Sequence, residues 1–338
     1  MMKVLHAGIF QDHCLGGDIV FRKGLLANGL EHESFDFRQI LAEHGQAEMN
    51  RRLVERAASR DLLFIGKGES ISPQALRDVR RSGCKVTIWY GDARLEPEPW
   101  LVDNLRECDV LFMSSAGDTL RHYFEVGRPK CAACYLNPCD PHLVEEFTDV
   151  PVSVDRPLFS GTYYGFMGPE REEVMRYLSR RWDIQVIGTT RYLGNNSFLR
   201  HLSNRFFPVR YLRGKNYIEK IIRCKFGIGV SAFQNIKYYT SDRLTHYLLF
   251  GKLYLAYYFP GCETLFDIGK ELDCYHGVQE LKQKIRFYLR NPEQAEAMGR
   301  RGQEKMCRDY NATCMVRMML DVINTGTSSV YPWVEVHS

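Results

Sequence analysis

Short apolar runs alternate with amphipathic segments along the first 130 residues of the chain. The apolar runs predict strands, and the segments with apolar positions three or four apart predict helices. Alternation of this kind builds a parallel sheet with helices on both faces, so the first half is predicted to be Rossmann-like. The predicted strands are 4–9, 34–37, 62–65, 86–90 and 110–113, and the predicted helices are 18–28, 42–59, one after 73, 100–107 and 119–126.

The pattern changes at the proline- and acid-rich stretch "NPCDPHLVEEFTDVPVSVDRP", which is typical of an interdomain connection. A second alternating series follows it, and three helices close the chain. We therefore expect an N-terminal Rossmann-like domain over 1–150, a C-terminal one over 151–325 and a tail over 326–338. The second series predicts strands at 163–166, 184–187, 226–230, 253–258 and 272–275, and helices at 170–180, 197–205, 217–223, 242–250, 278–289, 292–307 and 312–323.

Loops that follow strands carry the candidate chemistry of the first half, because ligands bind at the carboxyl ends of parallel strands. Gly16 and Gly17 allow a ligand to approach the backbone at a helix N-terminus, although a tight turn also explains them. Asp92 lies just past a predicted strand, where its carboxylate is placed to accept a proton or to cap a turn.

Two loops of the second half bring arginines to the equivalent edge. Gly168 and Arg171 follow one predicted strand, and Arg191 follows the next. A guanidinium offers a fork of donors that suits phosphate oxygens. Each arginine alone is equally compatible with an ordinary surface position.

The segment "YYTSDRLTHYLLFGK" provides the most specific signal. Thr240, Ser241 and Asp242 can cap a helix that begins there, and Arg243 falls in its first turn, where the helix dipole disfavours a cation. A bound diphosphate would reverse that penalty, because free backbone N–H groups, two hydroxyls and the guanidinium would then share two phosphates. Glu263 lies at another predicted helix start and could bind sugar hydroxyls or cap that helix.

Composition excludes several classes of protein. The chain has 45% hydrophobic and 25% charged residues, and no apolar stretch long enough to cross a bilayer. Its beginning has no apolar core of a signal peptide, so a cytoplasmic location is expected, and eleven scattered cysteines are expected to be reduced. The net charge is +4, with a basic stretch between 191 and 225 that would attract phosphates or simply be solvated.

A zinc site is an open alternative at Cys131, Cys134, Cys139 and His142, whose spacing is compatible with a tetrahedral metal centre. The first two cysteines fall in a predicted strand, where they would point to opposite faces. No metal is therefore included in the predicted site.

Taken in order, these motifs resemble the C-terminal domain of GT-B glycosyltransferases, and most closely the CgeB-like group of bacterial and phage proteins. The resemblance covers about 161–323. It rests on Gly165-x-x-Gly168 with Arg171, Ser241-Asp242-Arg243 before Gly251, Pro260-Gly261-Cys262-Glu263-Thr264-Leu265-Phe266, Asn291-Pro292-Glu293, and Asp309-Tyr310-Asn311 with Arg317. The N-terminal half matches more loosely through "LLFIGKG", "CKVTIWYGDA" and "YLNPCDP".

The resemblance implies two Rossmann-like domains facing a central cleft, the GT-B fold, and transfer of a sugar from a nucleotide-diphosphate sugar such as a UDP-sugar, without a catalytic metal or other cofactor. The acceptor would be a glycan or DNA carrying a modified base. Many retaining relatives have two glutamates where this chain has Tyr238 and His246, and His246 could still bind a ribose hydroxyl. The donor-side residues expected are Gly16, Gly17, Gly168, Arg171, Arg191, Tyr239, Thr240, Ser241, Arg243, His246 and Glu263.

The mechanism depends on the stereochemistry, which the sequence leaves open. An inverting reaction needs a base from the first half, with Asp92, His13 and Asp12 as candidates in that order. A retaining reaction could use the leaving phosphate itself. Two alternatives also remain, a nucleotide-sugar epimerase of the same fold and a nucleic-acid-binding protein that uses the basic stretch 191–225.

Overall fold

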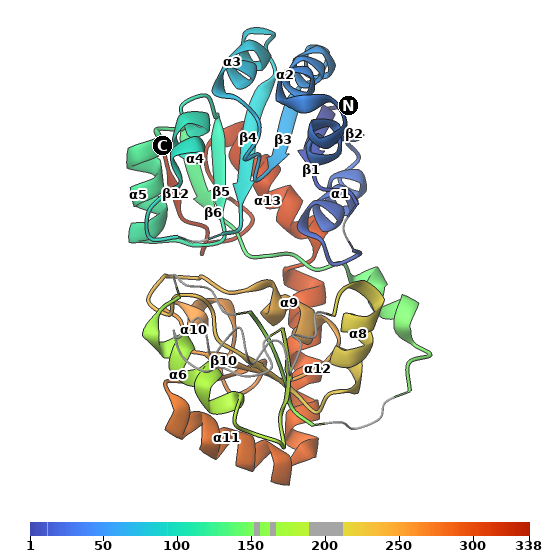
Figure 1. The fold of residues 1–338 in the computed structure, drawn as a ribbon, viewed down its shortest axis with the longest axis vertical. Helices are drawn as coiled ribbons and strands as arrows, with labels where there is room; N and C mark the ends of the chain where they lie inside the picture. The colour runs from blue at the N-terminus through green and yellow to red at the C-terminus, as the bar shows by residue number, and fades with distance from the viewer. Residues whose placement is uncertain (12, 93, 152–155, 163–166, 189–211) are drawn as a thin grey trace. The chain divides into compact units, whose positions relative to one another are not determined.

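Two parallel sheets organise the chain, as Figure 1 shows. The structure is a computed structural model and describes residues 1–11, 13–92, 94–151, 156–162, 167–188 and 212–338. The chain divides into a first unit, made of 1–140, 236–238 and 310–338, and a second unit, made of 141–235 and 239–309. Among the described residues no helix has the length and apolar character needed to cross a membrane.

The first unit contains a seven-stranded sheet in the order β12-β6-β5-β4-β3-β1-β2, in which β12 alone is antiparallel to its neighbour. Its core consists of apolar side chains from the strands and the packed helix faces. The elements are β1 (Lys3–Gly8), α1 (Gly17–Ala27), β2 (Glu31–Asp36), α2 (Phe37–Ala57), β3 (Leu62–Gly66), α3 (Pro73–Arg81), β4 (Lys85–Tyr90), α4 (Pro99–Leu105), β5 (Val110–Met113), α5 (Asp118–Gly127), β6 (Cys131–Cys134), α13 (Ala312–Thr325) and β12 (Val336–His337).

The second unit contains a five-stranded parallel sheet in the order β11-β10-β9-β7-β8. Its core joins the apolar faces of α6, α11 and α12 to the strands. The described elements are η1 (Pro141–Phe147), β7 (Leu158–Ser160), α6 (Pro169–Leu178), β8 (Gln185–Ile187), α8 (Gly214–Arg223), β9 (Gly227–Gly229), α9 (Asp242–Leu249), β10 (Tyr254–Tyr257), α10 (Cys262–Leu265), β11 (Asp273–Tyr275), α11 (Val278–Arg290) and α12 (Pro292–Asp309).

The end of the chain differs from the sequence-based division into domains. The sequence assigns helix α13 to the C-terminal domain, but this helix packs on α1 in the first unit, where Gly24 leaves room for the Ala312 backbone and for Val316. The predicted tail also joins this unit, because β12 pairs with β6. The chain leaves the first unit after Asp140 rather than near 150.

Most predicted strands coincide with observed ones, but the first observed strand of the second unit is not among the predicted strands. It is β7, which precedes the predicted 163–166; those residues lie outside the described part of the chain. The three-residue strand starts directly after Pro157, and such a short apolar run gives a weak periodic signal. The predicted helix 197–205 also lies outside the described residues.

Each sheet has a point at which the strand order reverses, and ligands of open α/β sheets bind beside that point at the carboxyl ends of the strands. In the first sheet it lies between β1 and β3, and in the second between β7 and β9. A binding site is therefore expected at one such position in each unit.

Candidate active site

Arg243 lies at the strand-order reversal of the second sheet. Its Nη1 donates to the carbonyl oxygen of Ser160, the last residue of β7, at 2.8 Å. Its Nη2 donates to the carbonyl of Val230, directly after β9, at 3.1 Å, and its Nε donates to the Ser241 hydroxyl at 3.0 Å. The guanidinium therefore ties the ends of both strands to the turn that starts α9.

Neutral groups surround this guanidinium. Ser160 Oγ lies 3.0 Å from the Tyr217 hydroxyl and 3.4 Å from the Tyr247 hydroxyl. Burial raises the pKa of Tyr217 to about 12, so this phenol stays uncharged at neutral pH. Within the described residues no carboxylate forms an ion pair with Arg243. A positive charge held in this way remains available to an anion at the carboxyl edge.

The turn before α9 offers further donors. Ser241 is the N-cap residue, yet its side chain does not cap the helix. Its oxygen accepts from Arg243, so its hydroxyl proton is directed elsewhere. Backbone N–H groups at the first turn of a helix have no partner inside the helix. A hydroxyl and a helix N-terminus beside a guanidinium form a suitable place for phosphate oxygens.

Arg171, a second arginine predicted to bind the donor, lies at the same reversal but has a different environment. Its side chain is 1% exposed, and its guanidinium donates to the carbonyls of Val230 and Thr162, the latter at 2.8 Å. So deeply buried a side chain braces the strand ends and has no open face toward a ligand. The prediction of direct donor contact is therefore corrected for this residue.

Five more of the predicted donor residues belong to the second half of the sequence. Thr240 is buried, Tyr239 is half-buried, and the His246 ring packs edge-on against Tyr217 at 5.8 Å. Gly168 is the N-cap of α6, but its N–H donates to the Ala232 carbonyl at 2.8 Å and is not free for a ligand. Arg191 lies outside the described residues.

Glu263 sits in the first turn of α10, away from the reversal, where it accepts from the Tyr258 hydroxyl at 3.2 Å. It lines a hollow of about 470 Å³ together with other acidic groups, Asp267 and Glu271, and Lys305. Its predicted contact with the donor sugar remains a prediction.

In the first unit, Asp92 lies at the carboxyl edge, in the loop after β4. Its Oδ2 accepts from Lys67 Nζ, in the loop after β3, at 2.8 Å, and its side chain is 54% exposed. Lys67 is not among the predicted site residues. His13 accepts the Leu15 N–H at Nδ1, at 3.2 Å, while Asp12 lies outside the described residues.

Gly16 and Gly17 occur where the sequence places them, at the start of α1. The Gly16 N–H donates to the His13 carbonyl at 2.7 Å and is used by the turn. A Cβ on Gly17 would lie 2.6 Å from the Trp89 ring, so packing against β4 requires glycine there. Both observations support a structural use of these glycines, and their predicted contact with the donor stays a prediction.

Asp18 occupies the strand-order reversal of the first sheet and is not among the predicted site residues. Its buried carboxylate accepts the Ile9 N–H at 2.8 Å and lies 3.0 Å from His6 Nε2. A Cβ at Gly8 or Gly66 would collide with it, at 2.4 and 2.0 Å. Glycines at the ends of two strands, together with an acid at the start of a helix, are the sequence signal that could have identified Asp18.

His6 and His32 form a pair beside Asp18, and we expect this pair to make the stability of the first unit depend on pH. His6 Nδ1 lies 3.3 Å from His32 Nε2, and burial, followed by the charges of His6 and Arg22, lowers the pKa of His32 to about 4. Because an unfolded histidine titrates near 6.5, the unfolded state binds more protons between those values, and stability falls as pH falls. We expect a loss on the order of 2 kcal/mol between pH 7 and 4. Chemical denaturation across this pH range should show a smaller loss for His32→Gln, and an unchanged pH slope in that variant would contradict the assignment.

The alternative zinc site is not formed by the structure. No group of three or more His, Cys, Asp or Glu side chains in the described ranges is placed to hold a metal ion, and all four zinc candidates fall inside those ranges. Cys131, Cys134 and Cys139 are buried, whereas the His142 side chain is 81% exposed.

The segment before the α9 turn is held by the end of the chain. The Lys237 carbonyl accepts the Ala116 N–H at 2.9 Å, and Lys237 Nζ binds Glu335 at 3.2 Å. Glu335 also accepts the Gly117 N–H at 3.0 Å, and the Tyr238 ring lies edge-on against Trp333 at 5.9 Å. Three residues upstream of the predicted donor turn are thus anchored in the first unit.

Comparisons with known proteins find one family model and several similar solved structures. Residues 171–321 match a family model described as glycosyl transferase-like. The structure of Anabaena HepE in complex with UDP-glucose is similar, with 13% identity, a TM-score of 0.63, and coverage of 96% of this chain and 100% of that chain. Sucrose-phosphate synthase from Thermosynechococcus elongatus has 13% identity, a TM-score of 0.64, and coverage of 96% and 98%. AviGT4, a glycosyltransferase involved in avilamycin A biosynthesis, has 14% identity, a TM-score of 0.59, and coverage of 96% and 97%. In sequence, no curated protein matches the chain.

The structural likeness confirms the predicted fold, and the family match bears out the predicted class of enzyme. The chain therefore has the GT-B fold, with a glycosyl transferase-like region over 171–321.

Proposed function

We propose that this protein transfers a sugar from a nucleotide-diphosphate sugar, which it binds at the start of α9, to an acceptor hydroxyl. The observation that carries the proposal is the position of Arg243 and Ser241 at the strand-order reversal of the second sheet. A UDP-sugar is the first donor to test, because the HepE structure contains UDP-glucose. The CgeB-like motifs favour a bacterial or phage enzyme of this kind.

The leaving diphosphate gives the α9 turn its role. Negative charge develops on the phosphate oxygens as the glycosidic bond breaks, so fixed donors there stabilise the transition state more than the ground state. Most N–H donors of Arg243 are used by protein oxygens. The direct donors to phosphate would therefore be the α9 backbone N–H groups and the Ser241 hydroxyl, with Arg243 supplying charge and fixing the turn. This would replace a catalytic metal, and activity retained in EDTA would support that part of the proposal.

A thermal-shift panel of nucleoside diphosphates and UDP-, GDP- and TDP-sugars tests the proposal. At least one nucleotide should raise the unfolding temperature, because a ligand that binds only the folded state stabilises it. Incubation of the protein with the best sugar nucleotide alone, followed by product analysis, separates a transferase from an epimerase. The function would have to be abandoned if no member of the panel stabilised the protein.

Asp92 is the proposed base for an inverting reaction. Its exposed carboxylate at the carboxyl edge of the first sheet, beside Lys67, could accept the acceptor proton. We expect Asp92→Asn to lower kcat by about 10²–10⁴-fold with little change in donor KM. Asp103→Asn is the matched control, because its side chain is equally exposed and also binds a cation. A retained kcat in Asp92→Asn would exclude this base and favour a retaining reaction.

Two kinds of acceptor fit the proposed transfer. A glycan and DNA carrying a modified base are both compatible with a hydroxyl acceptor, and the described part of the basic stretch, 212–225, gives DNA no specific support. Transfer assays with both acceptors distinguish them, and salt-sensitive retention of DNA would be required for the second.

A further inference from the structure

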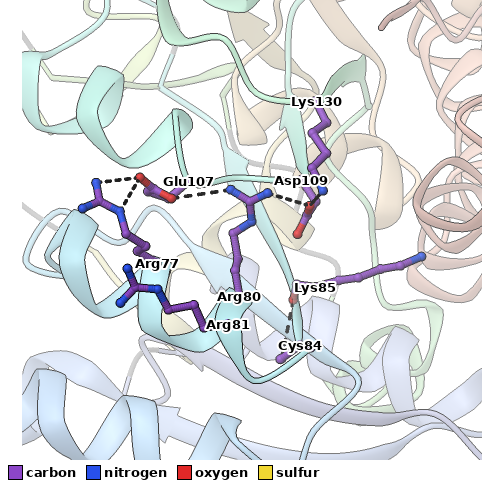
Figure 2. A pocket seen from close by; sticks show the side chains of 9 residues that line it. Arg77, Arg80, Arg81, Cys84, Lys85, Glu107, Asp109 and Lys130 are labelled. Atoms are coloured by element: carbon purple, nitrogen blue, oxygen red, sulfur yellow. Dashed lines mark hydrogen bonds and ion pairs between the residues drawn. The ribbon is translucent and has the colours of Figure 1, made fainter.

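A hollow of about 380 Å³ opens at the edge of the first sheet where the strands begin (Figure 2). Lys85 starts β4, while Asp109 and Lys130 directly precede β5 and β6. The candidate residues of this unit lie at the opposite, carboxyl edge of the same parallel strands. The hollow is therefore separate from the site described above. It is lined by Arg77, Arg80, Arg81, Gly83, Cys84, Lys85, Glu107, Asp109 and Lys130.

The lining carries an excess of positive charge, with five cationic and two anionic side chains. Glu107 binds Arg77 at 2.8 Å and Arg80 at 3.5 Å. Asp109 binds Lys130 at 2.7 Å and lies 3.8 Å from Arg80. Two carboxylates thus hold three cations in place and cannot neutralise them. Arg81 and Lys85 also line the hollow, where Arg81 binds Asp78 at 3.0 Å and Lys85 Nζ donates to the Ile323 carbonyl at 3.1 Å.

The acidic side chains of the hollow are more buried than the most exposed basic ones. The side chains of Glu107 and Asp109 are 13% and 14% exposed, whereas those of Arg81 and Lys130 are 70% and 67% exposed. Figure 2 shows Arg80 reaching between the two carboxylates. The carboxylates therefore lie deep and orient the cations, and the rim presented to solvent is cationic.

The end of a helix explains only part of this arrangement. Arg80 and Arg81 lie in the last turn of α3, where the helix dipole favours cations. Lys85 and Lys130 come from strand starts, where no such dipole acts. Four of the five cations bind a carboxylate, yet the lining keeps an excess of positive charge from three elements, which a bound anion would neutralise.

We propose that this hollow is a second binding site, which takes the phosphate groups of a water-soluble ligand. Guanidinium forks match phosphate oxygens, and a volume of this size suits a small phosphorylated molecule. The large exposed apolar side chains of the described residues, Met1, Leu26, Leu95, Val126, Trp182 and Phe287, do not line it. A site for insertion into lipid would carry such side chains, so the hollow favours a ligand in solution over a membrane surface.

Hydrogen–deuterium exchange of the full chain with inorganic pyrophosphate tests this site. We expect pyrophosphate to protect peptides that cover 77–85 and 107–110. The variant Arg81→Gln/Lys130→Gln removes two exposed rim charges and leaves the Glu107 pairs intact, and it should weaken this protection by about tenfold in pyrophosphate concentration. Arg106→Gln/Arg121→Gln removes two exposed cations from outside the hollow, each also paired with an aspartate, and should leave the protection unchanged.

The same measurement separates this site from the proposed donor site. Protection around 239–249 should persist in Arg81→Gln/Lys130→Gln, so either site can fail without the other. The proposal is overturned if 77–85 shows no protection, or if both double variants behave alike. It is also overturned if phosphatidylglycerol vesicles protect these peptides and pyrophosphate does not, since the ligand would then be a membrane.

Discussion

Replacement of Arg243 by alanine is expected to abolish most of the thermal stabilisation that a nucleotide-diphosphate sugar gives. The guanidinium holds the Ser241 hydroxyl, β7 and β9 in one arrangement, so its loss removes both the charge and the geometry of the turn. At a ligand concentration 100 times Kd, the wild type gains about 2.7 kcal/mol from binding, and a variant with 100-fold weaker affinity gains about 0.4 kcal/mol. Thermal unfolding with and without nucleotide measures the difference.

Two further variants make this result specific. Arg243→Lys keeps the charge but not the fork, so we expect an intermediate response. Arg176→Ala removes an exposed arginine paired with Glu172 in the same unit and should bind nucleotide as the wild type does. An Arg243→Ala protein that folds and responds fully to nucleotide would remove the turn from the donor site.

The second large effect is expected from Gly299→Ala in α12. Alanine normally stabilises a helix interior by about 1 kcal/mol relative to glycine. Here a Cβ would lie 2.2 Å from the Gly251 carbonyl oxygen and 2.7 Å from the Leu253 N, which are backbone atoms that cannot rotate away. The cost of overpacking should therefore exceed the gain in helix propensity, with a net loss of about 3 kcal/mol in the free energy of unfolding.

Gly277→Ala is the control for this prediction. Gly277 has an extended backbone, with φ of 163°, and no atom of the described residues lies within 4 Å of the place that an added methyl group would take. Gly277 is the N-cap of α11, so alanine there should cost only about 0.5–1 kcal/mol, the ordinary difference between glycine and alanine at an N-cap. Urea denaturation of both variants decides the matter. Equal stability of Gly299→Ala and the wild type would mean that α12 and the Gly251 turn separate more easily than their packing suggests.

The local pattern predicts most elements but not their partners. The helix at 312–323 and the strands around 62–65 and 86–90 follow from apolar periodicity, and the structure places them there. The packing of α13 on α1 could not be predicted from the apolar face of α13. Such a face can pack against an apolar surface of either unit. The strand Val336–His337 is two residues long and pairs with β6 through contacts some 200 residues distant, which no window of sequence contains.

The candidate site was predictable where a residue directly follows a strand or starts a helix. Asp92, Ser241 and Arg243 meet that condition. Arg171 meets the same condition, and only the tertiary structure shows that its guanidinium donates to backbone carbonyls. Asp18 escapes prediction because an acid at a helix start is an ordinary cap, and its neighbours Gly8 and Gly66 become informative only when the strands stand side by side.

The return of segment 236–238 to the first unit has a consequence for domain exchange. The chain crosses between units after residues 140, 235, 238 and 309, so neither unit is a continuous cassette. Consider a chimera in which only residues before the linker near 140 come from a relative. It would keep Lys237 and Tyr238 of this chain, but these residues would contact the relative's loop in place of Ala116 and Gly117. Donor specificity should therefore transfer between relatives only when the loop after β5, the segment 236–238 and the final strand are exchanged as a set.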